Sequence, residues 1–326
     1  MKLRDPRILV CGTLKGRGIE ILEMAGCDVD HQPEHKPGSL ADVIEPFVGV
    51  IVHSHHFVDA ATINAGSALR VVGRAGAGVD NIDVQAATEA GVLVMNLPWG
   101  NTITAAEHTV ALMLALARNI PQASAALRAG TWDRKPYLGV ELSGKILGVI
   151  GLGRIGREVV RRAHVFEMQV IASDPYVSER VAADVGIEIV SLAELLSRVD
   201  VLTVHVPLNR ETHHLIDADA LAAMKPGARV INCARGGLVD EKALLSSLES
   251  GHTGGAAFDV FEQEPEVNLD LLAHLHFIGT PHLGGATLEA QEKIGEGIAQ
   301  QVADFLCEGT IHHAINVQAL SPEEQS

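Results

Sequence analysis

The sequence predicts an α/β protein with two domains, each built on a doubly wound parallel sheet. Short apolar segments alternate with longer helical segments along the chain, a pattern typical of parallel strands joined by crossover helices. Only 3% of the residues are aromatic although 47% are hydrophobic, so aliphatic residues build the cores, as suits a sheet covered by helices on both faces. A length of 326 residues leaves room for two such domains.

The first hundred residues predict the first sheet. Strands are expected at 7–10, 48–52, 69–72 and 92–95, with a helix at 16–25. A turn-rich stretch at 96–101 then leads into an apolar helix at about 102–118. This helix carries Glu107 and His108 and is too short to span a bilayer, so we interpret it as a buried or domain-crossing helix.

The strand and helix pattern restarts at residue 145. Strands are expected near 146–150, 169–173, 200–204, 229–232, 254–258 and 277–279. After Pro281 only a helix at about 286–307 and a short segment at 311–319 remain, which is too little for a domain. We expect this part to pack back on the first domain. The domains would then be 1–98 plus 286–326, for substrate, and an inserted 99–285.

A glycine-rich turn follows the strand at 146–150. Gly151 permits the tight turn, Gly153 lets the backbone approach a pyrophosphate, and Gly156 lets the next helix pack closely on the sheet. The amino end of that helix offers unpaired N–H groups to phosphates. Asp174 stands 18 residues after Gly156, where a carboxylate accepts hydrogen bonds from a ribose and repels a 2′-phosphate. The sequence therefore predicts a binding site for NAD rather than NADP.

Charge and cysteine content exclude several classes of protein. The formal net charge of −16 argues against nucleic acid, whose phosphates require a basic face. The four cysteines lack C-x-x-C spacing, so they indicate reduced thiols rather than a disulfide framework or a zinc site. The amino terminus lacks the apolar core of a signal peptide. We therefore expect a cytoplasmic protein that binds neither nucleic acid nor membrane.

Three loops that follow successive strands carry residues suited to catalysis. The first presents Arg235, the last presents His282, and the loop between them presents Asp259, Glu262 and Glu264. Because parallel strands end at one edge of the sheet, these groups share a rim. A guanidinium grips a carboxylate through two parallel N–H bonds, and an imidazole takes a hydroxyl proton as hydride leaves.

This set of groups is what the oxidation of a 2-hydroxy acid requires. A carboxylate bonded to the second ring nitrogen fixes the tautomer of the histidine and raises its pKa. The residues alone leave open which carboxylate, that of Asp259, Glu262 or Glu264, is the partner of His282.

Four segments resemble the D-isomer-specific 2-hydroxyacid dehydrogenase family, over nearly the whole chain from about residue 7 to 319. They are VVGRAGAGVDN at 71–81, GLGRIGR at 151–157, NCARGG at 232–237 and PHLGGA at 281–286. The similarity is greatest to the phosphoglycerate-oxidising branch of the family. The resemblance implies a Rossmann NAD-binding domain inserted into a flavodoxin-like substrate domain. It also implies a homodimer that pairs through the NAD-binding domain and the helix near 102–118.

The resemblance also implies roles for individual residues. The catalytic residues would be Arg235, Glu264 and His282, which makes Glu264 the partner of the histidine. The cofactor would be held by Gly151, Gly153, Arg154, Ile155, Gly156, Asp174, Val206, Cys233, Ala234, Asp259 and Gly284. The substrate would be held by His53, Ser54, Arg74, Gly76, Ala77, Gly78, Asn101, Arg134 and Lys135, with its carboxylate on the N–H groups of 74–78.

Departures from the family pattern bear on the substrate. His53 stands where the phosphoglycerate-oxidising enzymes have an arginine for the phosphorylated end, and a neutral imidazole lacks the fixed charge and the bidentate fork. Ala77 and Val206 replace threonines common in close relatives. Arg134 and Lys135, which relatives place near the phosphate from the partner subunit, are retained.

We therefore expect a small anionic substrate, with 3-phospho-D-glycerate and 3-phosphohydroxypyruvate as the first candidates. Hydroxypyruvate, glyoxylate, or a substrate bearing a phosphonate or sulfonate are the alternatives. A non-enzymatic alternative is an NAD-sensing corepressor, since such proteins resemble this family and keep the three catalytic residues. That function needs an exposed apolar cleft for a peptide, which residues 1–60 do not indicate.

Sixteen histidines raise the question of a metal site. They form tight sets at 53–56, 213–214 and 312–313. None has the helical i, i+4 spacing with a nearby carboxylate that is typical of zinc, and neighbouring side chains on a strand point to opposite faces. We expect no metal, and interpret 53–56 as a polar pocket wall.

Overall fold

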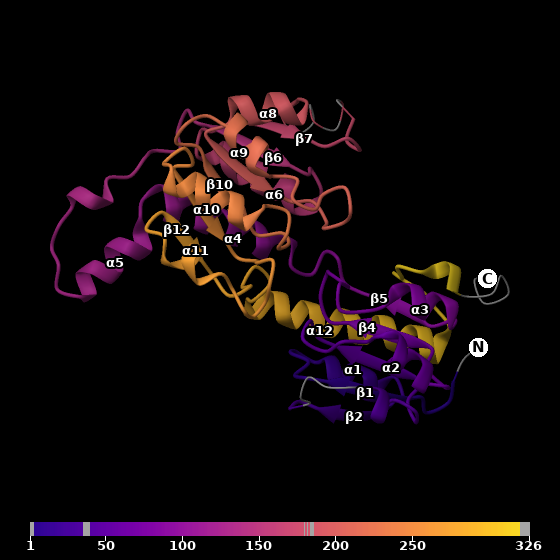
Figure 1. Cartoon of the computed structure of the whole chain (residues 1–326). Helices are drawn as coiled ribbons and strands as arrows, with labels where there is room; N and C mark the ends of the chain where they lie inside the picture. The colour runs from indigo at the N-terminus through magenta and orange to yellow at the C-terminus, as the bar shows by residue number, and fades with distance from the viewer. Residues whose placement is uncertain (1–2, 35–39, 179, 181, 183–185, 320–326) are drawn as a thin grey trace. The chain divides into compact units, whose positions relative to one another are not determined.

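The computed structural model describes residues 3–34, 40–178, 180, 182 and 186–319 (Figure 1). The chain divides by packing into two compact units. Unit 1 comprises Met1–Asn101 and Gly285–Ser326, and unit 2 comprises Thr102–Gly284. Unit 2 is thus inserted between the two segments of unit 1, and the expectation that the end of the chain returns to the first sheet is confirmed. The assignment of substrate binding to unit 1 stays a prediction.

Unit 1 contains a five-stranded parallel sheet. Its strands are β1 (Arg7–Cys11), β2 (Asp28–Gln32), β3 (Gly49–Val52), β4 (Val71–Arg74) and β5 (Leu93–Met95). Their order, β2-β1-β3-β4-β5, is that of the flavodoxin-like fold, which confirms the predicted fold class. The sequence pattern missed β2, because Val29 is the only apolar residue of this edge strand and none of its side chains is fully buried.

Helices cover both faces of this sheet. They are α1 (Gly18–Met24), α2 (Ala60–Ala65), α3 (Val84–Glu89) and α12 (Leu288–Ala303), with short turns η1 (Leu40–Asp42), η3 (Asp304–Glu308) and η4 (Val317–Ala319). In β1, Ile8 and Val10 pack in a cluster with α1 and α12, whereas Leu9 and Cys11 pack in a second cluster on the opposite face. This alternation follows from the pleat of a strand whose two faces are both covered.

Unit 2 contains a seven-stranded parallel sheet. Its strands are β6 (Ile146–Ile150), β7 (Gln169–Ser173), β8 (Glu188–Ile189), β9 (Val201–Val204), β10 (Arg229–Asn232), β11 (Gly255–Phe258) and β12 (Phe277–Gly279). Their order, β12-β11-β10-β9-β6-β7-β8, contains the Rossmann order 3-2-1-4-5-6 with one further strand, so this part of the predicted fold is also confirmed. The prediction missed β8, which has only two residues.

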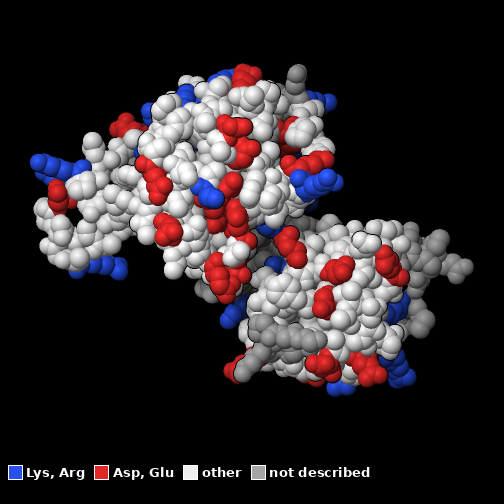
Figure 2. All heavy atoms as spheres, viewed as in Figure 1, with Lys and Arg blue, Asp and Glu red and all other residues white. Residues whose placement is uncertain are grey.

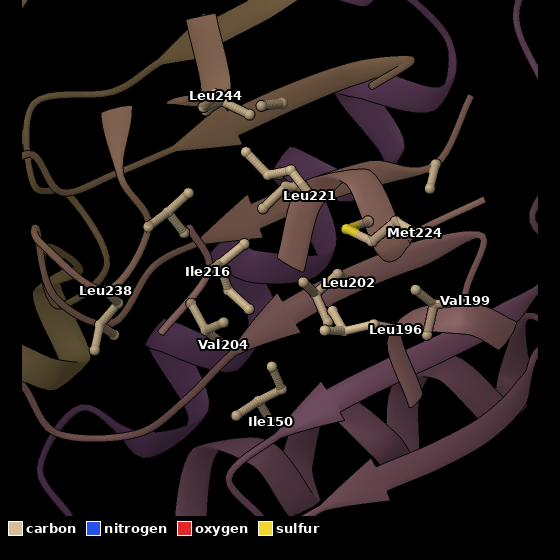
Figure 3. Packing of buried hydrophobic residues seen from close by; sticks show 14 of the residues in the cluster. Ile150, Leu196, Val199, Leu202, Val204, Ile216, Leu221, Met224, Leu238 and Leu244 are labelled. Atoms are coloured by element: carbon tan, nitrogen blue, oxygen red, sulfur yellow. The ribbon is translucent and has the colours of Figure 1, made fainter. Parts of the chain in front are cut away.

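Helices cover both faces of this sheet. They are α4 (Thr102–Ala117), α6 (Arg154–Val165), α8 (Leu192–Arg198), α9 (Ala218–Ala223), α10 (Glu241–Glu249) and α11 (Leu269–Ala273). Helix α5 (Ile120–Arg128) and the turn η2 (Lys135–Tyr137) lie apart from these layers. Leu202 and Val204 of β9 lie in a cluster with Leu196 of α8 and Leu221 of α9 (Figure 3). Val201 packs with α4 and α6 on the other face. Burial contributes about 1.5–3 kcal/mol for each such side chain.

Residues 118–140 extend from the rest of unit 2 as an arm that carries α5 (Figure 1). The N–H of Val140 donates to the carbonyl oxygen of Ala117 over 2.9 Å and closes the base of the arm. No residue of α5 is buried. Lys and Arg side chains stand out on the arm, while acidic side chains are spread over the visible faces of both units (Figure 2).

Helix α4 is largely apolar in composition. Among the described residues, no single helix is long and apolar enough to cross a membrane. Only α4 and α5 together meet that requirement, by length and composition, and they are bent by 63°.

Candidate active site

The turn after β6 has the geometry expected of the glycine fingerprint. Gly151 has a φ of 90°, and a Cβ there would lie 2.7 Å from the carbonyl oxygen of His205 and from Cγ1 of Val206. A Cβ at Gly156 would collide with the carbonyl oxygen of Gly151, so only glycine lets α6 start this close to the turn. A Cβ at Gly153 would meet nothing within 4 Å. The turn is therefore open where a pyrophosphate requires space.

Asp174 is held beside this turn at the end of β7. Its Oδ2 accepts a hydrogen bond of 2.7 Å from the N–H of Leu152, and its Oδ1 accepts one of 2.9 Å from the N–H of Tyr176. Each carboxylate oxygen has a second lone pair for a ribose hydroxyl. No side chain caps the amino end of α6, which begins at Arg154 and Ile155. These residues fit a dinucleotide.

The loop after β10 holds Arg235 against the loop after β11. The amide of Asn232 donates to the carbonyl oxygen of Arg235 over 2.8 Å and accepts from the N–H of Ala234 over 3.1 Å. A Cβ at Gly236 would collide with the carbonyl oxygen of Phe261, so the two loops touch through their backbones. The guanidinium Nη1 of Arg235 donates to the carbonyl oxygen of Ala234 over 2.7 Å. Arg235 therefore projects from a closely supported turn.

His282 is paired with Glu264. Nδ1 of His282 lies 2.8 Å from Oε2 of Glu264, whose Oε1 accepts from the N–H of Phe261 over 2.9 Å. Glu262 lies elsewhere, because its Oε1 is 3.1 Å from Nε2 of His214 and accepts from the N–H of Glu241 over 3.1 Å. Glu264 is therefore the carboxylate that is hydrogen-bonded to His282, a point that the sequence left open. The catalytic role of Glu264 stays a prediction.

The pair shifts the titration of both groups. The hydrogen bond to Glu264 raises the pKa of His282, against the opposing effect of burial and of the charge on Arg235. Burial opposes ionisation of Glu264, but the hydrogen bonds from His282 and from the N–H of Phe261, together with the charge of His282, hold the pKa of Glu264 below its usual value. Arg235 and Glu264 therefore both lie within electrostatic range of His282 in unit 2.

Asp259 organises the segment that carries His282. This carboxylate is 1% exposed, and it accepts hydrogen bonds of 2.7 Å from the N–H groups of Leu283 and Gly284 and of 2.6 Å from Oγ1 of Thr280. The N–H of His282 donates to the carbonyl oxygen of Asp259 over 2.9 Å. His282 has a φ of 53°, a left-handed conformation that is uncommon outside glycine. These bonds hold the strained turn.

His108 is a member of this network that sequence reasoning missed. From α4, its Nε2 lies 3.1 Å from both Oδ1 of Asp259 and Oγ1 of Thr280. Burial opposes ionisation of Asp259, but the bonds from His108 and Thr280 hold its pKa below the usual value. The available signal was a histidine next to Glu107 in a largely apolar helix.

The predicted substrate loop of unit 1 follows β4. Nη1 of Arg74 donates to the carbonyl oxygen of Ala75 over 2.8 Å, and the amide of Asn96 donates to the carbonyl oxygen of Ala77. Gly76 has a φ of 148°, and a Cβ there would collide with the guanidinium of Arg74. The backbone conformation at Gly76 therefore favours glycine, and the arginine folds over this position.

His53 follows β3 and lies among other histidines. The centroid of its ring is 6.0 Å from that of His55 and 6.3 Å from that of His56. Burial lowers the pKa of His53 to about 4, and the neighbouring His55, His56 and Arg74 act in the same direction. Nε2 of His53 is buried without a hydrogen-bond partner. At neutral pH this position therefore carries no charge.

The remaining predicted residues are divided between the units. Ser54 is exposed after β3, Gly78 follows the Arg74 loop, and Asn101 lies beside Gly285 in unit 1. In unit 2, Cys233 and Ala234 follow β10, whereas Arg134 and Lys135 lie in the arm. The structure thus brings the predicted residues together in two sets, one in each unit, and leaves the arm pair in neither. Within the described ranges, no three His, Cys, Asp or Glu side chains are grouped to hold a metal ion.

Comparisons with known proteins agree with this geometry. Residues 110–284 match the family described as D-isomer specific 2-hydroxyacid dehydrogenase, NAD binding domain. The D-3-phosphoglycerate dehydrogenase of Rattus norvegicus is 45% identical over 97% of this chain and 59% of that protein, and that of Bacillus subtilis is 42% identical over 98% and 60%. Among solved structures, a glyoxylate reductase from Paecilomyes thermophila has a TM-score of 0.88 at 32% identity over 97% of this chain and 100% of that one.

A D-lactate dehydrogenase from Escherichia coli has a TM-score of 0.83 at 26% identity, over 95% of this chain and 99% of that one. The chain belongs to the D-isomer specific 2-hydroxyacid dehydrogenase family, and residues 110–284 are its NAD-binding domain. It spans about three fifths of the length of the phosphoglycerate dehydrogenases that it matches.

We expect Glu264→Gln to lower the pKa of His282, because glutamine keeps a hydrogen-bond acceptor but removes the negative charge. A proton NMR titration of the imidazole measures this shift. In the wild type, the pair stabilises the fold most between the ordinary pKa of a glutamate, about 4.3, and that of a histidine, about 6.5. That stability is lost as pH falls through the lowered pKa of Glu264 or rises through the raised pKa of His282. An unchanged histidine titration in Glu264→Gln would contradict the pairing.

Proposed function

We propose that the chain uses NAD to interconvert an anionic D-2-hydroxy acid and its 2-oxo acid, with 3-phospho-D-glycerate and 3-phosphohydroxypyruvate as the substrate pair. The observation that carries this proposal is the His282–Glu264 pair, 2.8 Å apart, in an NAD-binding domain that also presents Arg235. The relatives that are named phosphoglycerate dehydrogenases support the choice of substrate.

The proposed roles follow from the chemistry of the three side chains. The glycine turn and Asp174 would hold NAD, which would supply the hydride acceptor for the carbon that bears the hydroxyl group. Nε2 of His282 takes the hydroxyl proton, because Nδ1 is already bonded to Glu264. The carboxylate of Glu264 stabilises the imidazolium that results. Arg235 holds the substrate carboxylate through parallel N–H bonds. In the reverse direction His282 returns the proton to the carbonyl oxygen.

The cofactor is proposed to lie on the residues expected from the sequence. Gly151, Gly153 and Gly156 leave room for a pyrophosphate at the amino end of α6. The position of Asp174 favours NAD over NADP, because its carboxylate would repel a 2′-phosphate. Val206 stands beside the turn, and Gly284 is anchored to Asp259 close to His282.

A panel of substrates tests the proposal through NADH absorbance. It holds 3-phosphoglycerate, 3-phosphohydroxypyruvate, hydroxypyruvate, glyoxylate, and phosphonate and sulfonate analogues. Preferential turnover of the phosphoglycerate pair supports the proposal. Preferential turnover of another acid would support the proposed reaction but identify a different substrate. Binding of NAD without turnover of any acid would instead favour the NAD-sensing alternative.

We expect His53→Arg to increase the preference for 3-phosphoglycerate. The neutral imidazole of His53 would become a fixed cation, and a hydrogen bond to a charged group contributes about 1.5–3 kcal/mol, or roughly 10- to 100-fold in kcat/KM. The ratio of kcat/KM for 3-phosphohydroxypyruvate and hydroxypyruvate measures the effect. His55→Arg places the same charge on an exposed neighbour and serves as the control. An equal rise in both variants would mean that His53 does not contact the substrate tail.

We also propose a homodimer formed through unit 2 and its arm. Trp132 is 81% exposed and Leu138 is 88% exposed, and α5 buries none of its residues, so this apolar surface lacks a cover within unit 2. In such a dimer, Arg134 and Lys135 would serve the substrate site of the other copy.

The four cysteines are free thiols, which supports the proposed cytoplasmic location.

The arm predicts how the dimer responds to mutation. We expect Trp132→Ser combined with Leu138→Ser to raise the dissociation constant of the dimer at least tenfold. Each substitution removes apolar area that the dimer would bury, and burial of apolar area contributes about 25 cal/mol per Å² to the free energy of association. Analytical ultracentrifugation measures it. Met24→Ser, at a residue of unit 1 that is 79% exposed, is the control and should leave association unchanged. A doubly substituted arm that associates like the wild type would contradict an arm-mediated dimer.

A further inference from the structure

Two cysteines from opposite ends of the chain meet in unit 1. Sγ of Cys27 lies 3.7 Å from Sγ of Cys307, across 280 residues of sequence. Cys27 is 8% exposed, whereas Cys307 is partly exposed. A disulfide has an S–S length of about 2.05 Å, so the sulfur atoms would have to approach by roughly 1.7 Å. The contact carries no role in the proposed dehydrogenase site.

Both cysteines stand just beyond the ends of two helices that pack together. Cys27 follows α1, which ends at Met24, and Cys307 lies in η3, the single π-helical turn that continues α12. The two helices approach closely at glycines, because a Cβ at Gly18 of α1 would lie 2.8 Å from the carbonyl oxygen of Gly295 in α12. A bond between the sulfur atoms would therefore tie the ends of two helices that are already in backbone contact.

Unit 1 has a particular need for such a tie. It is built from two segments that the whole of unit 2 separates in sequence, Met1–Asn101 and Gly285–Ser326. Within the described residues, non-covalent contacts hold the second segment to the first, among them the 2.9 Å hydrogen bond from the N–H of Leu3 to the carbonyl oxygen of Leu306. A covalent link here would close the unit and restrict its unfolded state.

We propose that Cys27 and Cys307 form a dithiol modification site that reacts with low-molecular-weight disulfides, such as oxidised glutathione, to give a reversible intramolecular disulfide. The more exposed Cys307 loses its proton to solvent and attacks one sulfur of oxidised glutathione, so that a mixed disulfide forms and one glutathione leaves. Cys27 then loses its proton, attacks Sγ of Cys307 and displaces the second glutathione. The two protein thiols lose two electrons, and one oxidised glutathione becomes two reduced ones.

The second step controls the rate. Burial, with a contribution from Cys307, raises the pKa of Cys27 to about 12, so its thiolate is scarce at neutral pH. The disulfide therefore forms slowly at neutral pH and faster as pH rises. Cys11 and Cys233 are buried apart from this pair, and burial is the main cause that raises the pKa of each to about 12. They should remain thiols and report the selectivity of the reaction.

The test incubates the full chain with oxidised glutathione and counts free thiols after quenching and denaturation. We expect the count to fall from four to two, and non-reducing peptide mapping to find Cys27 joined to Cys307. Cys27→Ser should stop at a mixed disulfide of glutathione on Cys307, and Cys307→Ser should keep its three thiols. The same oxidant applied to chain unfolded in denaturant, where all thiols react, shows that the reagent is active.

The oxidised wild type should also unfold at a temperature higher by on the order of 5 °C, a gain that dithiothreitol reverses. Four remaining thiols, a stable glutathione adduct on wild-type Cys307, or a bond that involves Cys11 or Cys233 would each overturn the proposed site. A Cys27–Cys307 bond that leaves the unfolding temperature unchanged would overturn its role as a tie across unit 1. None of these readouts depends on turnover, so the proposal and the proposed function can fail separately.

Discussion

We expect His282→Asn to lower kcat/KM by about 10²- to 10⁴-fold, the usual contribution of general acid–base catalysis. Asparagine can still bond to Glu264 through its amide, and it tolerates the left-handed φ of 53° at this position. It cannot accept the hydroxyl proton as hydride leaves. The loss should therefore fall on kcat, while the affinity for NADH, measured by fluorescence titration, stays close to that of the wild type.

The control for this prediction is another histidine of unit 2. His276 is exposed just before β12, so His276→Asn removes an imidazole without touching the His282–Glu264 pair. It should keep the kcat/KM of the wild type. If His282→Asn lost less than tenfold in kcat/KM while thermal unfolding was unchanged, another group would have to move the proton.

Parts of the site that depend on local sequence could be predicted from it. Gly151, Gly153 and Gly156 sit in one turn, and the backbone geometry that they permit is local, so the spacing alone indicated a dinucleotide turn. Arg235 and His282 could be placed on one rim because parallel strands end at the same edge of a sheet. The two sheet orders followed from the alternation of strands and helices together with the family resemblance.

Features that depend on contacts between distant segments could not be predicted in this way. His108 reaches Asp259 across 151 residues of sequence, and Cys27 reaches Cys307 across 280. Nothing in the neighbourhood of either residue in the sequence encodes its partner. The low pKa of His53 has the same origin, since burial between segments causes it and hydropathy along one segment does not reveal it.

We expect Asp259→Ala to destabilise unit 2 by about 3–5 kcal/mol, because removing one partner of a buried charged network leaves its other members uncompensated. The substitution removes the carboxylate acceptor of four groups, which are the N–H groups of Leu283 and Gly284, the hydroxyl of Thr280 and the imidazole of His108. It also releases the turn that holds His282 at positive φ. Urea unfolding followed by circular dichroism measures the stability, and the NMR titration of His282 should report a lower pKa, since the charge of Asp259 raises it.

The dependence on pH distinguishes this network from simple packing. Hydrogen bonds hold the pKa of Asp259 below its usual value, so the stability that it contributes is present above about pH 3.9 and is lost as pH falls through the lowered pKa. The difference between wild type and Asp259→Ala should therefore shrink in acid. Asp219→Ala, at an exposed residue in the first turn of α9, should cost no more than about 0.5 kcal/mol at any pH. A loss of stability in Asp259→Ala that stayed constant into acid would mean that volume, and not the charged acceptor, holds the turn beneath His282.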